Sequence, residues 1–209
     1  MRTKARAIGL LLMFTGVLSI LSATGLYLYN QWDEERAAKA AAQTADELAA
    51  LIIERKSEEL PEHTAFDFGD KNEADNGIFL NGVRYIGILI MPAFDLALPV
   101  NSEWSYPKLR NSPCRYAGNI YDNTLVIAAH NYRTHFGNIS ALTKGETVIL
   151  IDVFGTEHQY SVEHISKIGP LDVYDVVGNG FDLTLFTCTF DGQARAVVKC
   201  MRSETSELL

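Results

Sequence analysis

The fold is decided by the stretch Asp182-Leu183-Thr184-Leu185-Phe186-Thr187-Cys188. It is rich in residues that favour strands and shows no helical spacing of apolar positions, so it predicts a strand. Residues 194–201 predict a second strand, and Asp191-Gly192 between them is the strongest short hairpin signal. With these two as loop residues, Cys188 stands opposite Arg195 on one face, their Cβ atoms about 5 Å apart. A guanidinium at that distance favours the thiolate, the reactive form of cysteine.

The alternation along the first strand separates an apolar face from a more polar one. Leu183 and Leu185 share one face, and Cys188 lies on the other. The face of Cys188 also carries Arg195 and Lys199 of the second strand, so we expect Cys188 to face an outer groove. The alternative is a core cysteine, since free cysteine is often buried.

The chain has three cysteines, an odd number for an exported protein. In the predicted register Cys200 pairs with Leu183 on the face opposite Cys188, so Cys188 and Cys200 should not form a disulfide. We expect Cys114 and Cys200 to be buried free thiols, and a bond between them is the alternative.

A thiol nucleophile usually works with an acid or base, and the chain has five histidines. His130 directly follows the apolar run Thr124–Ala129, and the end of a buried strand is a common place for a catalytic residue. A histidine in such a place is more often structural, and His135 is a competitor for the same role. The position directly after the strand favours His130. The remaining three lie in the expected linker or in ordinary strands: His63, His158 and His164.

Taken together, these residues resemble the sortases, the cysteine transpeptidases of Gram-positive cell surfaces. The resemblance rests on Thr-Leu-x-Thr-Cys at 184–188, on Ala129-His130-Asn131 and on Arg195 at the start of the last strand. It spans about residues 78–202. Two further matching stretches are Ile90-Met91-Pro92 and Leu98-Pro99-Val100.

The resemblance implies a transpeptidase that cleaves an LPxTG-like sorting signal of secreted proteins. Cys188 would attack the carbonyl before the final glycine, and His130 would protonate the departing amine. Arg195 would donate hydrogen bonds to the substrate carbonyl or the oxyanion. An amine of a cell-wall peptide or a pilin lysine would then resolve the thioacyl enzyme. Asn131 and Thr187 are expected to contact the substrate.

Two other classes of function remain open: a cysteine hydrolase that uses water, and a non-catalytic, membrane-anchored binding barrel. We expect no cofactor, and no HExxH or paired CxxC spacing predicts a metal site. The carboxylates of Asp172, Asp175 and Asp182 give a weak signal for calcium. The formal net charge is −8 and no basic stripe is visible, which argues against nucleic-acid binding.

Eight short apolar runs separated by turn signals predict an all-β domain, either a closed antiparallel barrel or a sandwich. The sortase resemblance implies an eight-stranded barrel. Short helices are expected at Ser105–Asn111 and Asn138–Leu142. The eight runs are Val83–Met91, Leu96–Val100, Arg115–Ile120, Thr124–Ala129, Glu146–Ile151, Glu157–Ile168, Asp182–Thr189 and Ala194–Met201.

The N-terminal region predicts a transmembrane anchor. Ala7–Tyr29 has no charged residue, and its length as a helix, roughly 34 Å, exceeds a bilayer core of about 30 Å. Basic residues precede this segment and Asp33-Glu34-Glu35 follow it, so the N-terminus should be cytoplasmic and the rest extracellular. The alternative is a signal peptide cleaved near Leu21-Ser22-Ala23, for which the apolar run is too long.

The chain therefore divides into three expected parts: 1–30 as tail and anchor, 31–77 as helical stalk and acidic linker, and 78–209 as catalytic barrel. Residues 31–76 carry 13 acids against 5 bases. The alanine-rich helix expected at Asp33–Lys56 has an apolar stripe through Ala41, Leu48, Leu51 and Ile52.

A solvated stalk is the favoured interpretation of this helix, and docking of the stripe on the barrel or on another copy is the alternative. Phe66-Asp67-Phe68 in the linker resembles the lid motif of pilus-building sortases only loosely.

Overall fold

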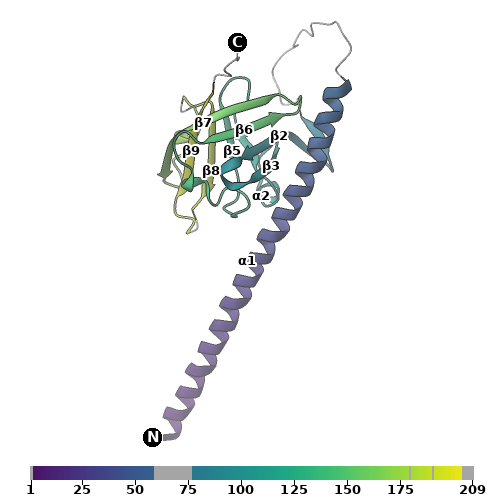
Figure 1. Ribbon diagram of the computed structural model, residues 1–209. Helices are drawn as coiled ribbons and strands as arrows, with labels where there is room; N and C mark the ends of the chain where they lie inside the picture. The colour runs from purple at the N-terminus through teal and green to yellow at the C-terminus, as the bar shows by residue number, and fades with distance from the viewer. Residues whose placement is uncertain (1, 59–76, 179, 190, 204–209) are drawn as a thin grey trace. The chain divides into compact units, whose positions relative to one another are not determined.

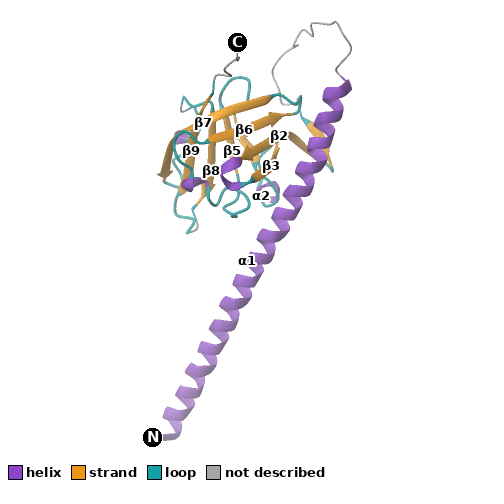
Figure 2. Cartoon of the chain, in the orientation of Figure 1, coloured by secondary structure: helices purple, strands orange, loops and turns teal. Residues whose placement is uncertain are grey.

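The computed structural model describes residues 2–58, 77–178, 180–189 and 191–203. An N-terminal helix, α1 (Arg2–Glu58), precedes a β-barrel domain (Figures 1 and 2). The two predicted helical segments, Ala7–Tyr29 and Asp33–Lys56, belong to this one helix. No proline or glycine lies between them, so nothing in the backbone interrupts the turn-to-turn hydrogen bonds. The loosely lid-like Phe66-Asp67-Phe68 and His63 lie outside the described residues.

Eight strands close into a barrel in the order β2-β3-β4-β5-β8-β9-β7-β6, and β6 pairs again with β2. The pairs β3–β4 and β5–β8 are parallel and the others are antiparallel. The predicted eight-stranded, all-β barrel is therefore confirmed. The prediction of antiparallel pairing throughout is wrong for the two parallel pairs, because the chain returns to β4 and to β8 by crossover connections and not by hairpins. The barrel strands are β2 (Val83–Met91), β3 (Leu96–Asn101), β4 (Cys114–Ala117), β5 (Leu125–Ala128), β6 (Thr147–Asp152), β7 (Glu157–Ile168), β8 (Leu183–Cys188) and β9 (Arg195–Arg202).

A ninth strand, β1 (Ile78–Leu80), forms a hairpin with β2 and has no counterpart among the predicted runs. Its turn residues Asn81 and Gly82 both have positive φ, which a two-residue hairpin turn requires. The Asn-Gly pair was thus a usable signal. The expected short helices are present as α2 (Tyr106–Leu109) and the 3-10 turn η2 (Ile139–Ala141), and two more turns are η1 (Pro92–Phe94) and η3 (Val173–Asp175).

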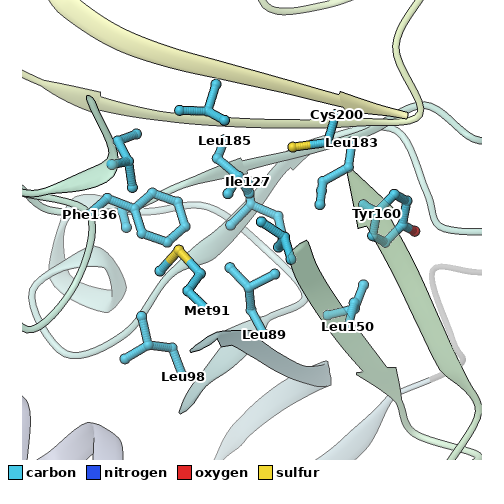
Figure 3. Packing of buried hydrophobic residues seen from close by; sticks show 14 of the residues in the cluster. Leu89, Met91, Leu98, Ile127, Phe136, Leu150, Tyr160, Leu183, Leu185 and Cys200 are labelled. Carbon is cyan, nitrogen blue, oxygen red and sulfur yellow. The ribbon is translucent and has the colours of Figure 1, made fainter. Parts of the chain in front are cut away.

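The barrel interior is filled by aliphatic and aromatic side chains from nearly every strand (Figure 3). Leu183 and Leu185 of β8 point inward and are fully buried, as the alternation predicted. Cys200 pairs with Leu183 and lies in the same core. Cys114 and Cys200 are both buried and free, and burial raises the pKa of Cys114 to about 11 and that of Cys200 to about 12.

A second buried cluster lies on the other face of β5, β8 and β9, where Phe186 packs with Val126 and Val197. Val176, which follows η3, and Leu109 of α2 pack against it. These strands are therefore buried on both faces. A side chain that points away from the barrel interior can still be buried, as Phe186 is.

The C-terminal half of α1 packs against the barrel. Its buried positions recur at helical spacing and include Leu48 and Ile52, which contact Tyr85 and Ile88 of β2. The side chain of Asn81 donates a hydrogen bond to Glu47 over 3.1 Å. The compact unit that contains the barrel begins at Ala37. The apolar stripe of α1 therefore docks on the barrel. This agrees with the alternative interpretation of the helix and not with a solvated stalk.

We expect Leu48→Ala to lower the free energy of unfolding of the barrel by about 2–4 kcal/mol, because Leu48 is fully buried between helix and barrel. Ile53→Ala is the matched control, since Ile53 on the same helix is 68% exposed. Urea denaturation of the full-length protein, followed by tyrosine fluorescence, measures both. Equal stability of the two variants would show that the helix contributes nothing to the barrel.

The first part of α1 is long and apolar enough to cross a membrane. Its large hydrophobic side chains between Ile8 and Trp32 are exposed in the structure. Such a surface is stable in a lipid environment, where exposed apolar side chains carry no hydration cost.

Candidate active site

Three neighbouring strands, β5, β8 and β9, bring the predicted residues together at one end of the barrel. In the β8–β9 hairpin Cys188 pairs with Arg195, which confirms the predicted register. In the parallel β5–β8 pair Ala128 lies beside Phe186, and His130 and Cys188 each follow two residues later, so both lie at the same end of this strand pair. Adjacent strands lie about 4.8 Å apart, which sets the spacing of these strands.

The turn that joins β8 to β9 differs in type from the predicted one. Gly192 has positive φ, at 69°, which glycine adopts without strain. The amide of Gly192 donates to the carbonyl of Thr189 over 2.8 Å, and Thr189 pairs with Ala194. The register is unchanged because the wider turn still closes on the Thr189–Ala194 pair.

Cys188 is the last residue of β8 and the first on that strand to be exposed, after five buried positions. Nη1 of Arg195 lies 3.7 Å from its Sγ. The Nε of Arg195 donates to the carbonyl of Pro170 over 3.1 Å, and the guanidinium carbon lies 5.6 Å from the ring centre of Phe186. The guanidinium is therefore held by a backbone acceptor and an aromatic face while one nitrogen points to the thiol.

His130 is partly buried just beyond the end of β5. Its Nδ1 lies 2.9 Å from Oδ1 of Asn131, and its ring stacks on Tyr132 with centroids 4.1 Å apart and planes at 12°. Asn131 was expected to contact substrate, and in the structure its side chain contacts the imidazole.

Thr187, also expected to contact substrate, is 3% exposed. Its hydroxyl donates to the carbonyl of Ala129 over 2.9 Å, which joins the end of β8 to the residue before His130. Strand alternation explains this burial, because Thr187 faces inward with Leu183 and Leu185. Contact of Thr187 with substrate stays a prediction.

The competitor His135 is 1% exposed, and neither of its ring nitrogens has a hydrogen-bond partner among the described residues. Burial, with a smaller contribution from nearby His130, lowers the pKa of His135 to about 4. An imidazole without contact to solvent and neutral above that pH cannot exchange protons with a bound substrate. His158 is also engaged elsewhere, in a buried pair with Asp152 at 2.8 Å.

Below pH 6.5 the protein should lose stability because of His135. The unfolded chain takes up a proton near pH 6.5 and the folded chain only near 4, so stability rises with pH across this window and is complete above it. The loss at pH 4 is about 3 kcal/mol. We expect His135→Phe to reduce the pH dependence of the urea-unfolding free energy between pH 4 and 6.5. A slope in His135→Phe equal to that of the wild type would contradict this assignment.

A chain of aromatic ring contacts leads from α2 to Phe186, whose ring lies under the guanidinium of Arg195. The sequence analysis did not predict these contacts. Tyr116 of β4 meets Phe186 edge-on at 5.1 Å, Trp104 meets Tyr116 at 6.0 Å, and Tyr106 meets Trp104 at 4.9 Å. These residues come from three separate elements, so no local spacing could have indicated these contacts.

A family model of the sortase domain matches residues 89–203, which is more than half of the chain and includes His130, Cys188 and Arg195. This protein belongs to the sortase family. Sortases are cysteine transpeptidases, and the eight-stranded barrel described above is their fold. Comparison with curated proteins gives no match.

Solved sortase structures share the fold of this sortase at low sequence identity. A sortase D5 transpeptidase from Clostridium perfringens is 20% identical, with a TM-score of 0.58, and the match covers 79% of this chain and 99% of that one. Sortase C of Streptococcus pneumoniae is 21% identical, with a TM-score of 0.53 and coverage of 83% and 95%. A sortase C from Clostridium perfringens, determined with its C-terminal cell wall sorting motif, is 19% identical, with a TM-score of 0.51 and coverage of 81% and 95%.

Proposed function

We propose that this sortase cleaves an LPxTG-like sorting signal of secreted proteins through a thioacyl intermediate on Cys188 and transfers the acyl group to an amine. The observation that supports the proposal is that His130 follows β5, Cys188 ends β8 and Arg195 opens β9, three neighbouring strands, with an exposed thiol at Cys188. The amine comes from a cell-wall peptide or a pilin lysine.

Each step of the reaction needs one of these groups. The Cys188 thiolate attacks the carbonyl carbon before the final glycine of the signal, and Arg195 hydrogen-bonds to the oxyanion that forms. Collapse of the tetrahedral intermediate breaks the C–N bond, and His130 protonates the departing amine. The incoming amine gives its proton to His130, attacks the thioester and releases the Cys188 thiolate.

We further propose that α1 anchors the enzyme with its N-terminus in the cytoplasm and the barrel outside the cell. Arg2, Lys4 and Arg6 precede the apolar segment and acidic residues follow it. This orientation places the active site on the side of the membrane where secreted proteins emerge.

Incubation of the full-length protein in detergent with a library of sorting-signal peptides tests the proposal. Reactions with and without added amine donors are compared by mass spectrometry. A transfer product that forms only with an amine supports the transpeptidase. Cleavage that stays hydrolytic with every amine supports the hydrolase. Absence of cleavage, together with failure of Cys188 to react with a thiol-reactive peptide analogue, would overturn the proposal in favour of a binding barrel.

A further inference from the structure

The loop between β7 and β8 begins with a four-residue turn, residues 169–172, whose two ends are tied together twice. The amide of Asp172 donates to the carbonyl of Gly169 over 3.3 Å, and the amide of Gly169 donates to Oδ2 of Asp172 over 2.9 Å. Pro170 occupies the second position of this β-turn, where its fixed φ is favoured. The turn is therefore closed by one backbone bond and one side-chain bond.

The carbonyl of Pro170 connects this turn to the candidate active site. In a β-turn the carbonyl of the second residue takes no part in the hydrogen bond that closes the turn. The carbonyl of Pro170 instead accepts a hydrogen bond from Nε of Arg195 over 3.1 Å. Nη1 of the same guanidinium lies 3.7 Å from Sγ of Cys188. The turn thus supplies the backbone acceptor that fixes a guanidinium whose other nitrogen reaches the thiol.

The direction of the Pro170 carbonyl depends on the type of turn. Types I and II differ by a reversal of the central peptide, so the carbonyl of the second residue points to opposite sides of the turn in the two types. Type II requires positive φ at the third residue, which is Leu171, and Leu171 is not among the described residues that have it. Because leucine rarely adopts positive φ, Leu171 keeps the Pro170 carbonyl on the side of Arg195.

The side chains of Leu171 and Asp172 have little role in packing. The side chain of Leu171 is 86% exposed, and Asp172 is also exposed. What position 171 contributes is therefore its backbone conformation, and what Asp172 contributes is the carboxylate that closes the turn. Substitutions at these two positions can change the turn without opening a cavity in the core.

We propose that Leu171 and Asp172 are positioning residues for Arg195. They hold the turn in the form in which the Pro170 carbonyl binds Nε, so that Nη1 is directed at Cys188. The consequence for catalysis rests on the proposed function, whereas the orientation of the guanidinium does not. A guanidinium that is already oriented needs no rearrangement when the oxyanion forms beside Cys188.

The hydrogen bond at Nε can be tested without any substrate. Full-length protein labelled with 15N-arginine in detergent micelles gives Nε–H signals, and loss of one signal in Arg195→Lys assigns Arg195. We expect this Nε–H to exchange with water about tenfold more slowly than in a free arginine side chain. Leu171→Gly should raise its exchange rate about tenfold relative to Leu171→Ala. Both variants lack the leucine side chain, but only glycine allows the central peptide to reverse.

Asp172 offers a second matched pair of variants. Asp172→Ala removes the acceptor of the Gly169 amide, whereas Asp172→Asn keeps an acceptor oxygen on a side chain of the same length. We expect exchange at Nε of Arg195 to be about threefold faster in Asp172→Ala and close to the wild-type rate in Asp172→Asn. Because Asp172→Asn also removes the negative charge, this pair separates closure of the turn from simple attraction between the carboxylate and the guanidinium.

A peptide assay tests the consequence for catalysis. Leu171→Gly should lower kcat about tenfold relative to Leu171→Ala at the same KM, because a misdirected guanidinium meets the oxyanion poorly. In an Arg195→Lys background the two substitutions should have equal effects, since the guanidinium that binds Pro170 is absent. A Leu171 side chain that contacts substrate would instead lower activity equally in Leu171→Gly and Leu171→Ala in both backgrounds. Thermal unfolding of each variant identifies misfolding.

The outcomes separate the positioning proposal from the proposed function. Slow exchange at Nε that is lost in Leu171→Gly and kept in Leu171→Ala supports the positioning of Arg195. The same result in a protein that cleaves no peptide overturns the function alone. Equal exchange rates in the two Leu171 variants, or a wild-type Nε–H that exchanges as in free arginine, overturn the positioning proposal, and peptide transfer by that protein leaves the function in place. Equal kcat in the two Leu171 variants overturns the catalytic consequence.

Discussion

Replacement of Cys188 with alanine is expected to abolish both cleavage and acyl transfer, a loss on the order of 10⁴-fold or more, while the barrel stays folded. Cys188 is exposed at the end of β8, so its side chain contributes little packing. Its Sγ lies 3.7 Å from Nη1 of Arg195, so the guanidinium can stabilise the thiolate. Mass spectrometry should detect a thioacyl adduct with the wild type and none with Cys188→Ala.

The two other cysteines are matched controls of the same residue type. Cys114 and Cys200 are fully buried, and burial raises the pKa of both thiols well above the physiological range, so neither forms a thiolate or reaches a substrate. Cys114→Ala and Cys200→Ala should lower stability by about 1–2 kcal/mol and keep kcat/KM per folded molecule. Loss of turnover in Cys114→Ala at unchanged stability would contradict a single nucleophile at Cys188.

Arg195→Lys should lose activity by on the order of 10²-fold although the charge is kept, which is the scale for loss of an oxyanion donor. The structure explains why a point charge cannot substitute. Nε of Arg195 is bound to the Pro170 carbonyl while Nη1 reaches Cys188, so two nitrogens of one rigid group serve two partners. A lysine ammonium on a flexible stem cannot hold the backbone acceptor and still reach the thiol.

The measurement is kcat/KM for the wild type, Arg195→Lys, Arg195→Ala and Arg202→Ala. Arg202 is the control because it ends the same strand, roughly 23 Å away. Its Nη2 donates to the carbonyl of Ile120 over 2.9 Å, so Arg202→Ala should cost stability and not turnover. Near-normal rates for Arg195→Lys would show that charge alone matters. An inactive Arg202→Ala beside an active Arg195→Ala would move the functional arginine to the other end of β9.

Several features follow from local sequence. Strand alternation and a turn signal fixed the pairing of Cys188 with Arg195, and the register survived although the turn type was different, because the Thr189–Ala194 pair closes either turn. The histidine directly after an apolar run was correctly placed at the end of β5. These signals are local since hairpin pairing and strand ends depend on residues close in sequence.

What depended on distant segments was decided only by the tertiary structure. His130 and Cys188 come to the same end of the barrel through a parallel pairing of strands 58 residues apart, which no local pattern encodes. The stripe of α1 docks on the barrel because β2 offers an apolar face. The stripe alone could not show this, because the same pattern is expected of a helix that packs on any other apolar surface.

The sequence by itself determined an apolar N-terminal segment, a domain of short strands, and a cysteine and an arginine paired across a hairpin. The tertiary structure decided which protein groups the polar residues near the site contact. It joined the Thr187 hydroxyl to the carbonyl of Ala129, buried His135, and placed the Asn131 side chain at the edge of the His130 imidazole. The physical reason is that hydrogen-bond partners and burial depend on what covers each face, and the covering segments lie far away in the chain.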